Sequence, residues 1–198
     1  MKRFITILFL LIIPVALYSQ RFKGGILLGL NVSQIDGDSY AGFNKAGLVA
    51  GAYVFTEFTE NWSAQMEIRY AEKGSSTPFN YSDPIKYRLQ YVEIPLVVKY
   101  KLFKNFKLEA GLSFGYLFAA AQKDAAGYFQ FEEIPDRTET AICIGLTYDL
   151  FDRLTVGARG SYSLFPIWGD PLESYGKGAW FNSVITFGLY YRIEGKQN

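Results

Sequence analysis

Charged side chains within apolar segments are the groups of this sequence whose types and spacing could do chemistry. Carboxylates and cations at such positions can hold one another in ion pairs, relay protons, or line a path for a small solute. The candidates for such a polar site are Glu67, Arg69, Glu93, Lys99, Glu109 and Arg159. The elements that carry these residues decide which of these chemistries is open to them.

Histidine is absent from the chain, and Cys143 is its one cysteine. These absences remove Ser-His nucleophilic pairs, the commonest transition-metal ligand and a thiolate metal site. We therefore expect no enzymatic activity, no catalytic residue, no metal site and no cofactor. The 20 basic and 19 acidic residues nearly balance, which argues against a nucleic-acid partner.

The residues around these charges alternate between apolar and polar with a period of two, which is typical of β-strands. In the segment 62–73, Met66 and Ile68 lie on one face, whereas Glu67 and Arg69 lie on the other. The pattern predicts eight strands, near 25–32, 47–56, 62–73, 91–100, 106–118, 142–148, 154–162 and 185–192.

The links between these strands alternate in length. Short links lie near 57–61, 101–105 and 149–153, and longer ones lie near 33–45, 74–86, 122–137 and 165–177. Short periplasmic turns and long outer loops are typical of bacterial outer-membrane barrels. Because lipid offers no hydrogen bonds, every strand edge must be paired and the sheet must close. The sequence therefore predicts an all-β fold, a closed antiparallel eight-stranded transmembrane β-barrel with both termini in the periplasm.

The first residues have the features of a secretory signal. Lys2 and Arg3 precede an apolar stretch at 4–17, so we predict a signal peptide over 1–19 and an outer-membrane barrel domain over 20–198. The alternative is an uncleaved membrane anchor, for which the apolar stretch is shorter than the ~20 residues that a spanning helix needs.

The polar strand faces should point into the barrel, because the apolar faces must meet lipid. An eight-stranded barrel is just wide enough for side chains to fill it. We therefore expect the six charged candidates to pair with one another and plug the lumen. The alternative is that they line a narrow path for a solute or for protons. Pro95 lies inside a predicted strand and cannot donate a ladder hydrogen bond, so a bulge is expected there, with a functional kink as the alternative.

A soluble barrel of the lipocalin type is the alternative fold. Its alternation would be inverted, so that apolar residues would face an internal ligand. The glycines and charges of the polar face fit a narrow, filled lumen better than an apolar pocket.

Aromatic residues near the predicted strand ends indicate girdles at the membrane interfaces. At the short turns they are Phe55, Phe58, Trp62, Tyr100, Phe103, Phe106, Tyr148 and Phe151, and at the long loops they are Tyr70, Tyr87, Phe118, Phe165 and Trp180. The loops hold further aromatic residues, which either contact partners or fold over the barrel mouth: Tyr40, Phe43, Phe79, Tyr81, Tyr128, Phe129, Phe131, Trp168 and Tyr175.

Several segments carry a family resemblance. The stretch Tyr91-Val92-Glu93-Ile94-Pro95-Leu96-Val97-Val98-Lys99-Tyr100 resembles the PorT-like family of short outer-membrane β-barrels from Gram-negative bacteria. Phe22-Lys23-Gly24-Gly25 with Gly29-Leu30-Asn31 resembles the first strand of that family, and Gln65-Met66-Glu67-Ile68-Arg69-Tyr70 with Lys73-Gly74 resembles its third. The resemblance implies the fold and an outer-membrane location. Some members are implicated in protein secretion and gliding machinery, and no catalytic residue carries over.

These observations predict an outer-membrane barrel of structural or interaction type, linked to envelope assembly or protein secretion. Its expected partners are outer-membrane lipid and, through its loops or turns, envelope or secretion proteins. The alternative function is a narrow pore or transporter for a small solute.

Overall fold

The computed structural model of the chain describes residues 22–38, 42–78, 85–124, 127–129, 135–169 and 178–193. Its strands are β1 (Lys23–Asp36), β2 (Lys45–Glu57), β3 (Trp62–Lys73), β4 (Lys86–Lys101), β5 (Phe106–Asp124), β6 (Gly127–Phe129), β7 (Thr138–Phe151), β8 (Leu154–Ser163) and β9 (Phe181–Ile193). No helix within these ranges is long and apolar enough to cross a membrane. The predicted signal peptide lies outside the described residues.

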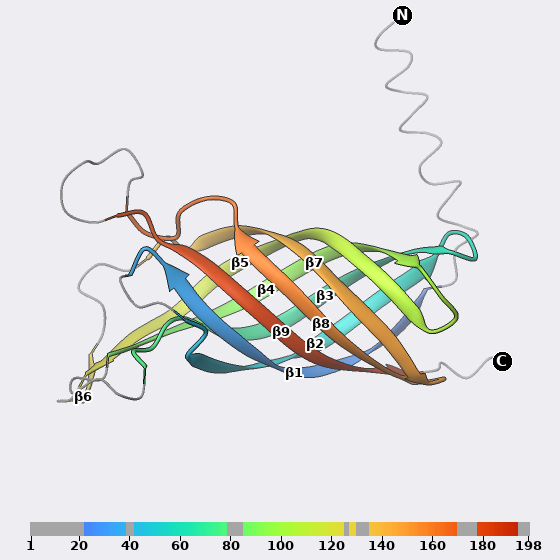
Figure 1. Cartoon of the computed structure of the whole chain (residues 1–198), viewed down its shortest axis with the longest axis horizontal. Helices are drawn as coiled ribbons and strands as arrows, with labels where there is room; N and C mark the ends of the chain where they lie inside the picture. The colour runs from blue at the N-terminus through green and yellow to red at the C-terminus, as the bar shows by residue number, and fades with distance from the viewer. Residues whose placement is uncertain are drawn as a thin grey trace, which may run out of the picture.

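The sheet closes on itself. The strand order is β4-β3-β2-β1-β9-β8-β7-β5, and β4 also pairs with β5. Neighbouring strands are antiparallel throughout, including β1 and β9, which join the two ends of the chain. Figure 1 shows the tilted strands wrapped around a common axis. The closed antiparallel eight-stranded β-barrel predicted from the sequence is confirmed, and β6 is a short additional strand that pairs with the end of β5.

The two faces of each strand differ as the alternation predicts. On β3, Met66 and Ile68 are 49% and 58% exposed, whereas Glu67 and Arg69 are 1% and 3% exposed. The apolar side chains therefore cover the outside of the barrel, and the charges lie within it. This arrangement suits lipid outside, and it is the reverse of a soluble barrel around an apolar ligand.

The connections alternate in length around the barrel. The links 58–61, 102–105 and 152–153 are short and lie at the right-hand end in Figure 1, whereas the strand ends joined by the longer links 37–44, 74–85 and 164–180 lie at the other end. The start of β1 and the turn between β7 and β8 both lie at the short-turn end, where Gly24 pairs with Ile193. The predicted alternation of short turns and long loops is thus present.

Pro95 sits in β4 without the expected bulge. It stands opposite Ser113 of β5 in an unbroken register. On the other side, the ladder of β3 and β4 omits two residue pairs between Met66–Leu96 and Arg69–Glu93 and then resumes in the same register. A residue without an N–H interrupts a ladder in this way without shifting it. The expectation of a bulge at Pro95 was therefore wrong.

The irregularity of this strand pair lies nearer the long loops, where the register of β4 and β5 shifts between Gln90 and Tyr91. On β5 both Phe118 and Ala119 are exposed, so the alternation breaks at that point. The break explains why the sequence pattern ended at residue 118, although β5 continues to Asp124.

Aromatic pairs mark both rims of the barrel. Trp62 and Tyr100 lie with ring centroids 4.7 Å apart, as do Phe106 and Tyr148, at the short-turn end. At the other end, the rings of Tyr70 and Phe118 are 6.1 Å apart. Such amphipathic rings suit the membrane interface.

Tyr87 and Trp180 do not belong to this girdle, contrary to the prediction. Their rings contact each other at 5.3 Å and pack against a buried apolar cluster at the long-loop end. Tyr87 shares its strand face with the buried Leu89 and Tyr91, so simple alternation turns it inward.

Candidate functional site

The six charged residues singled out from the sequence all lie inside the barrel. They come from four strands, with Glu67 and Arg69 on β3, Glu93 and Lys99 on β4, Glu109 on β5 and Arg159 on β8. None of them is more than 7% exposed. Each faces inward because the outward positions of its strand carry the apolar residues that meet lipid.

Arg159 lies between two carboxylates. Its Nη1 and Nη2 donate to the two carboxylate oxygens of Glu67 at 3.0 and 2.7 Å, and its Nε donates to Glu109 Oε1 at 2.6 Å. The planar guanidinium suits this forked geometry better than a lysine would. A single cation from β8 thereby connects β3 with β5 across the lumen.

The ion pairs extend from Arg159 in both directions. Lys99 Nζ lies 3.2 Å from Glu109, and Arg69 lies 3.4 Å from Glu67. Arg69 Nε also donates to Glu93 at 2.8 Å. The structure thus brings all six candidates into one connected group.

Two further residues belong to this group and were not among the candidates. Lys73 Nζ lies 2.5 Å from Glu93 and 3.1 Å from both carboxylate oxygens of Glu139. The Glu139 carboxylate also accepts hydrogen bonds from Ser163 at 2.8 Å and from Asn182 at 3.0 Å. Glu139 thereby ties β3, β7, β8 and β9 together.

The sequence pattern missed these two residues for different reasons. The alternation puts Lys73 on the polar face of its strand. It was left out of the candidates because it stands at the end of that strand, beside Gly74. The predicted strand near 142–148 began too late to include Glu139. Cys143 and Ala141 point inward, and a period of two predicts that Glu139 does so too. The alternation therefore contained the information needed to find Glu139.

We call the resulting group the charge network: Lys99, Glu109, Arg159, Glu67, Arg69, Glu93, Lys73 and Glu139, in order of contact. Cations and anions alternate along it, and four of each give no net charge. Burial of a charge is tolerable only when it is paired and hydrogen-bonded. The network meets this condition, because each of its members has an ion-pair partner inside the barrel.

Inward glycines make room for these long side chains. A Cβ placed on Gly145 would lie 2.8 Å from Glu109 Oε1 and 3.0 Å from Arg159 Cα. The absence of a side chain on β7 at this height therefore permits the Glu109–Arg159 pair. The missing side chain of Gly145 thus leaves space for the network.

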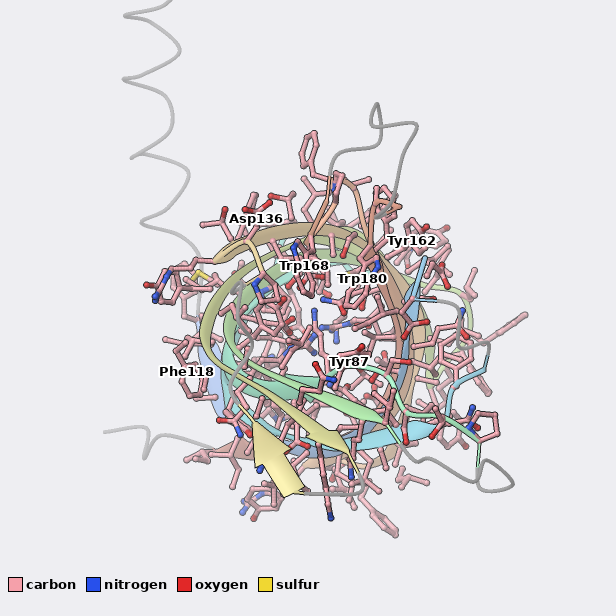
Figure 2. All side chains as sticks on the ribbon, turned by 90° about the vertical axis from the view of Figure 1, so that its left-hand side faces the viewer. Tyr87, Phe118, Asp136, Tyr162, Trp168 and Trp180 are labelled. Atoms are coloured by element: carbon pink, nitrogen blue, oxygen red, sulfur yellow. The ribbon has the colours of Figure 1, made fainter. Side chains whose placement is uncertain are left out.

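An apolar cluster closes the barrel above the charge network, toward the long loops. We call it the outer plug, and its buried members are Ile35, Leu89, Tyr91, Leu117 and Ile167. Figure 2 looks along the barrel from this end and shows Tyr87, Trp168 and Trp180 within the ring of strands.

Backbone hydrogen bonds hold the loop part of the outer plug in place. Ile167 N donates to the Trp180 carbonyl at 2.7 Å, and the Ile167 carbonyl accepts from Asp136 N at 2.7 Å. Of the loop aromatic residues, Trp168 thus folds over the mouth, and Phe43 is 40% exposed. The side chains of the other loop aromatic residues named above lie outside the described part of the chain.

The short-turn end is open. A cavity of about 480 Å³ enters the barrel from this side. Its walls include Tyr53, Lys99, Thr147 and Tyr190, so it reaches the first residue of the charge network. The walls of the cavity are mainly polar, and charged residues of the short turns form part of its rim.

The chemistry of this interior is ion pairing. Each described cation of the charge network contacts at least one carboxylate, which leaves no acid or base held apart from a partner for proton transfer. Within the described residues, no group of three or more His, Cys, Asp or Glu side chains is placed to hold a metal ion.

Comparisons with known proteins agree with this architecture. Ail, the attachment invasion locus protein of Yersinia pestis, solved in complex with the heparin analogue sucrose octasulfate, is 16% identical with a TM-score of 0.50. The match covers 87% of this chain and 99% of that one. Neisserial surface protein A is 9% identical with a TM-score of 0.51, over 87% of this chain and 96% of that one. At such identities the likeness shows the fold alone.

No curated protein sequence matches the chain. Residues 18–169 match the model of a family described as the outer membrane protein beta-barrel domain. This match spans most of the chain and agrees with the closed, apolar-surfaced barrel described above. The chain therefore belongs to the outer membrane protein beta-barrel domain family and is an outer-membrane β-barrel protein embedded in membrane lipid.

Proposed function

We propose that this protein is a non-conducting outer-membrane barrel that acts by contacting other envelope components, in envelope assembly or protein secretion. The observation that carries the proposal is the filled lumen, in which the charge network lies below the outer plug. A barrel filled in this way leaves its loops, turns and outer surface for function. The resemblance to PorT-like barrels supports a link to secretion, and the proposal includes no enzymatic activity.

The first test is electrical. We expect the full-length protein in planar bilayers to give no stable channels, because ion pairs and apolar side chains occupy the lumen. A 16-stranded porin in the same bilayers is the positive control, since barrels of that size leave an aqueous channel. Reproducible unitary steps from folded wild-type protein, checked by heat-modifiable mobility on a detergent gel, would overturn the proposal.

A narrow pore for a small solute is the second candidate function. The cavity of about 480 Å³ favours it, because this cavity already extends from the short turns to Lys99. A path through the barrel would further require the charge network and the outer plug to separate. Channel activity of the wild-type protein would favour this candidate over the first.

The proposal also includes an orientation, with the signal peptide 1–19 removed on export and both ends of the barrel domain 20–198 in the periplasm. Short turns face the periplasm in barrels of this kind. Labelling of intact cells with a membrane-impermeant maleimide tests this orientation in a Cys143→Ser background. We expect Phe165→Cys, in a long loop, to be labelled, and Lys104→Cys, in a short turn, to react only after lysis. The reverse pattern would show the opposite orientation, and the wild-type protein controls for reaction at the buried Cys143.

A further inference from the structure

The cavity of about 480 Å³ at the short-turn end of the barrel has the size of a ligand site. Pockets that hold small molecules in proteins commonly have volumes of about 300–1,000 Å³. We call this one the turn-end cavity. It extends inward from the short turns as far as Lys99, and the charge network and the outer plug occupy the lumen beyond that residue. A small organic molecule therefore fits in it without any path through the barrel.

Two tyrosines line the turn-end cavity and lie close to the barrel wall. A Cβ on Gly25 would lie 2.7 Å from Tyr53 Cε1, and a Cβ on Gly188 would lie 3.0 Å from Tyr190 Cε2. Because these glycines have no side chain, the rings occupy the space beside the strands. The two rings also meet edge to face, with their centroids 5.6 Å apart. The glycines thus help to keep the centre of the cavity open.

The tyrosines bring hydrogen-bonding groups as well as ring faces. Within the described part of the chain, neither the Tyr53 nor the Tyr190 hydroxyl has a hydrogen-bond partner, and neither is among the buried polar atoms. A phenolic hydroxyl can donate one hydrogen bond. Both hydroxyls are therefore available to a ligand in the turn-end cavity.

Lys99 supplies a cation at the floor of the turn-end cavity. Its ammonium nitrogen lies 3.2 Å from a Glu109 carboxylate oxygen and 5.2 Å from the centroid of the Tyr190 ring. An ammonium group has three N–H donors, and one carboxylate contact leaves two of them. Glu109 also accepts from Arg159 at 2.6 Å, so two cations share its negative charge. The floor therefore presents a positive donor with an incomplete set of partners.

Cations also outnumber carboxylates around the walls. Among the described wall residues, six are lysine or arginine and four are aspartate or glutamate. Lys107 pairs with Asp149 at 2.7 Å, whereas Lys101 and Lys104 have no carboxylate within ion-pair distance in the described ranges. An excess of one sign of charge in a cleft raises the local concentration of ligands of the opposite sign. The walls therefore favour the entry of an anion.

We propose that the turn-end cavity binds a small organic carboxylate with an aromatic body. The carboxylate accepts hydrogen bonds from Lys99 and from the Tyr53 and Tyr190 hydroxyls. The body packs beside Phe55, whose ring is stacked with that of Tyr53 at a centroid distance of 6.1 Å. The floor offers one cation, which already contacts Glu109, so a monoanion suits it better than a dianionic phosphate. This site is additional to the contacts with envelope components proposed above.

Titration calorimetry of the purified, folded barrel in detergent tests this inference. The probes are benzoate, its neutral isostere benzamide, phenyl phosphate and acetate, and titration into detergent alone gives the background. We expect benzoate to bind about tenfold or more tightly than benzamide, because a charge-assisted contact contributes on this scale. Acetate lacks the aromatic body and should also bind about tenfold or more weakly than benzoate.

Four results would overturn the proposal. Absence of benzoate binding would exclude the site, and equal affinity for benzoate and benzamide would exclude recognition of the charge. Tighter binding of phenyl phosphate than of benzoate would exclude the preference for a carboxylate. Acetate binding as tight as that of benzoate would exclude a role for the aromatic body.

The variant Lys99→Gln removes the charge at the floor, while Glu109 keeps its hydrogen bond from Arg159. We expect this variant, once its folding is checked by heat-modifiable mobility, to bind benzoate no more tightly than benzamide. Lys86→Gln is the matched control, because it makes the same substitution at the other end of β4 and should keep the preference. Retention of the preference by Lys99→Gln would contradict the inference.

Gly188→Ala tests the same cavity without a change of charge, and it keeps the proposal testable if Lys99→Gln does not fold. The atoms nearest to the added methyl group belong to the Tyr190 ring, so the ring must move toward the cavity. We expect benzoate and benzamide both to bind more weakly, whereas Gly160→Ala, whose nearest atom is 3.8 Å away, should leave both affinities unchanged. Unchanged affinities in Gly188→Ala would place the ligand elsewhere. Binding in detergent is independent of conductance and of envelope partners, so failure here is distinguishable from failure of the proposed function.

Discussion

Replacement of Arg159 by alanine is expected to lower the free energy of unfolding by about 3–5 kcal/mol, the range for breaking a buried ion pair by removing one partner. Arg159 is 2% exposed and donates to Glu67 and Glu109. Without it, Glu67 keeps a hydrogen bond from Gln65 at 2.7 Å and an ion pair with Arg69 at 3.4 Å, and Glu109 keeps its ion pair with Lys99 at 3.2 Å. Urea titration of the barrel in lipid vesicles, followed by heat-modifiable mobility, measures the change.

Lys107→Ala provides the matched control for this prediction. Lys107 lies 2.7 Å from Asp149, but these two side chains are 29% and 30% exposed. A solvated pair contributes about 0–1 kcal/mol, so the control should unfold near the wild-type midpoint. If Arg159→Ala were no more destabilising than Lys107→Ala, the charge network would not hold the barrel together.

A compensated variant separates lost pairing from lost volume. Arg159→Met combined with Lys99→Met, Glu67→Gln and Glu109→Gln removes the cation, both of its carboxylates and Lys99, whose ion-pair partner among the described residues is Glu109. Replacement of a buried ion group by neutral side chains of similar size is often close to neutral. We therefore expect this variant to recover much of the stability that Arg159→Ala loses.

Substitution of Gly111 by alanine is expected to be the most disruptive small change in the wall of the barrel. A Cβ at this position would lie 2.7 Å from Val97 Cα and 2.9 Å from the Leu96 carbonyl carbon, and it would collide with the Leu96 carbonyl oxygen. These atoms belong to the backbone of β4, and the pairing of β4 with β5 closes the barrel. The strands cannot separate locally without loss of ladder hydrogen bonds, which have no replacement in lipid.

We expect Gly111→Ala to lower stability by about 1–3 kcal/mol or more, as overpacking does, and to reduce the folded fraction after refolding into vesicles. Gly160→Ala on β8 is the control, because the nearest atom to its Cβ would be the Ile144 carbonyl oxygen at 3.8 Å. That substitution should change stability by no more than about 0.5 kcal/mol. Equal behaviour of the two variants would show that the β4–β5 contact is not as close as described.

The charge network explains how the interior of a membrane barrel can hold many ionisable groups in paired form. Its members alternate in sign, and each contacts a partner on another strand or two positions along its own. The apolar belt places the protein in lipid, and the filled interior gives the wall internal support. The surfaces that remain for recognition are the loops, the short turns and the outside of the barrel.

The alternation of the sequence was sufficient to predict the barrel, the eight strands and the inward direction of all six charged candidates. A residue two positions from an inward residue also points inward, so the face of a strand position follows from local chemistry. The alternating length of the links predicted which strand ends lie together. These properties depend on neighbours along the chain, and the printed sequence contains them.

The partners of each charge were decided only by the tertiary structure. Lys73 meets Glu139, 66 residues away, because the register of three successive strand pairs brings them to the same height. Periodicity predicts the face that a side chain occupies, but its height in the lumen depends on the tilt and stagger of the closed barrel. For the same reason the sequence could not show that Tyr87 and Trp180 join the outer plug, or that Glu109 and Glu67 share Arg159. Local pattern determined which residues point inward, and closure of the sheet determined which of them meet.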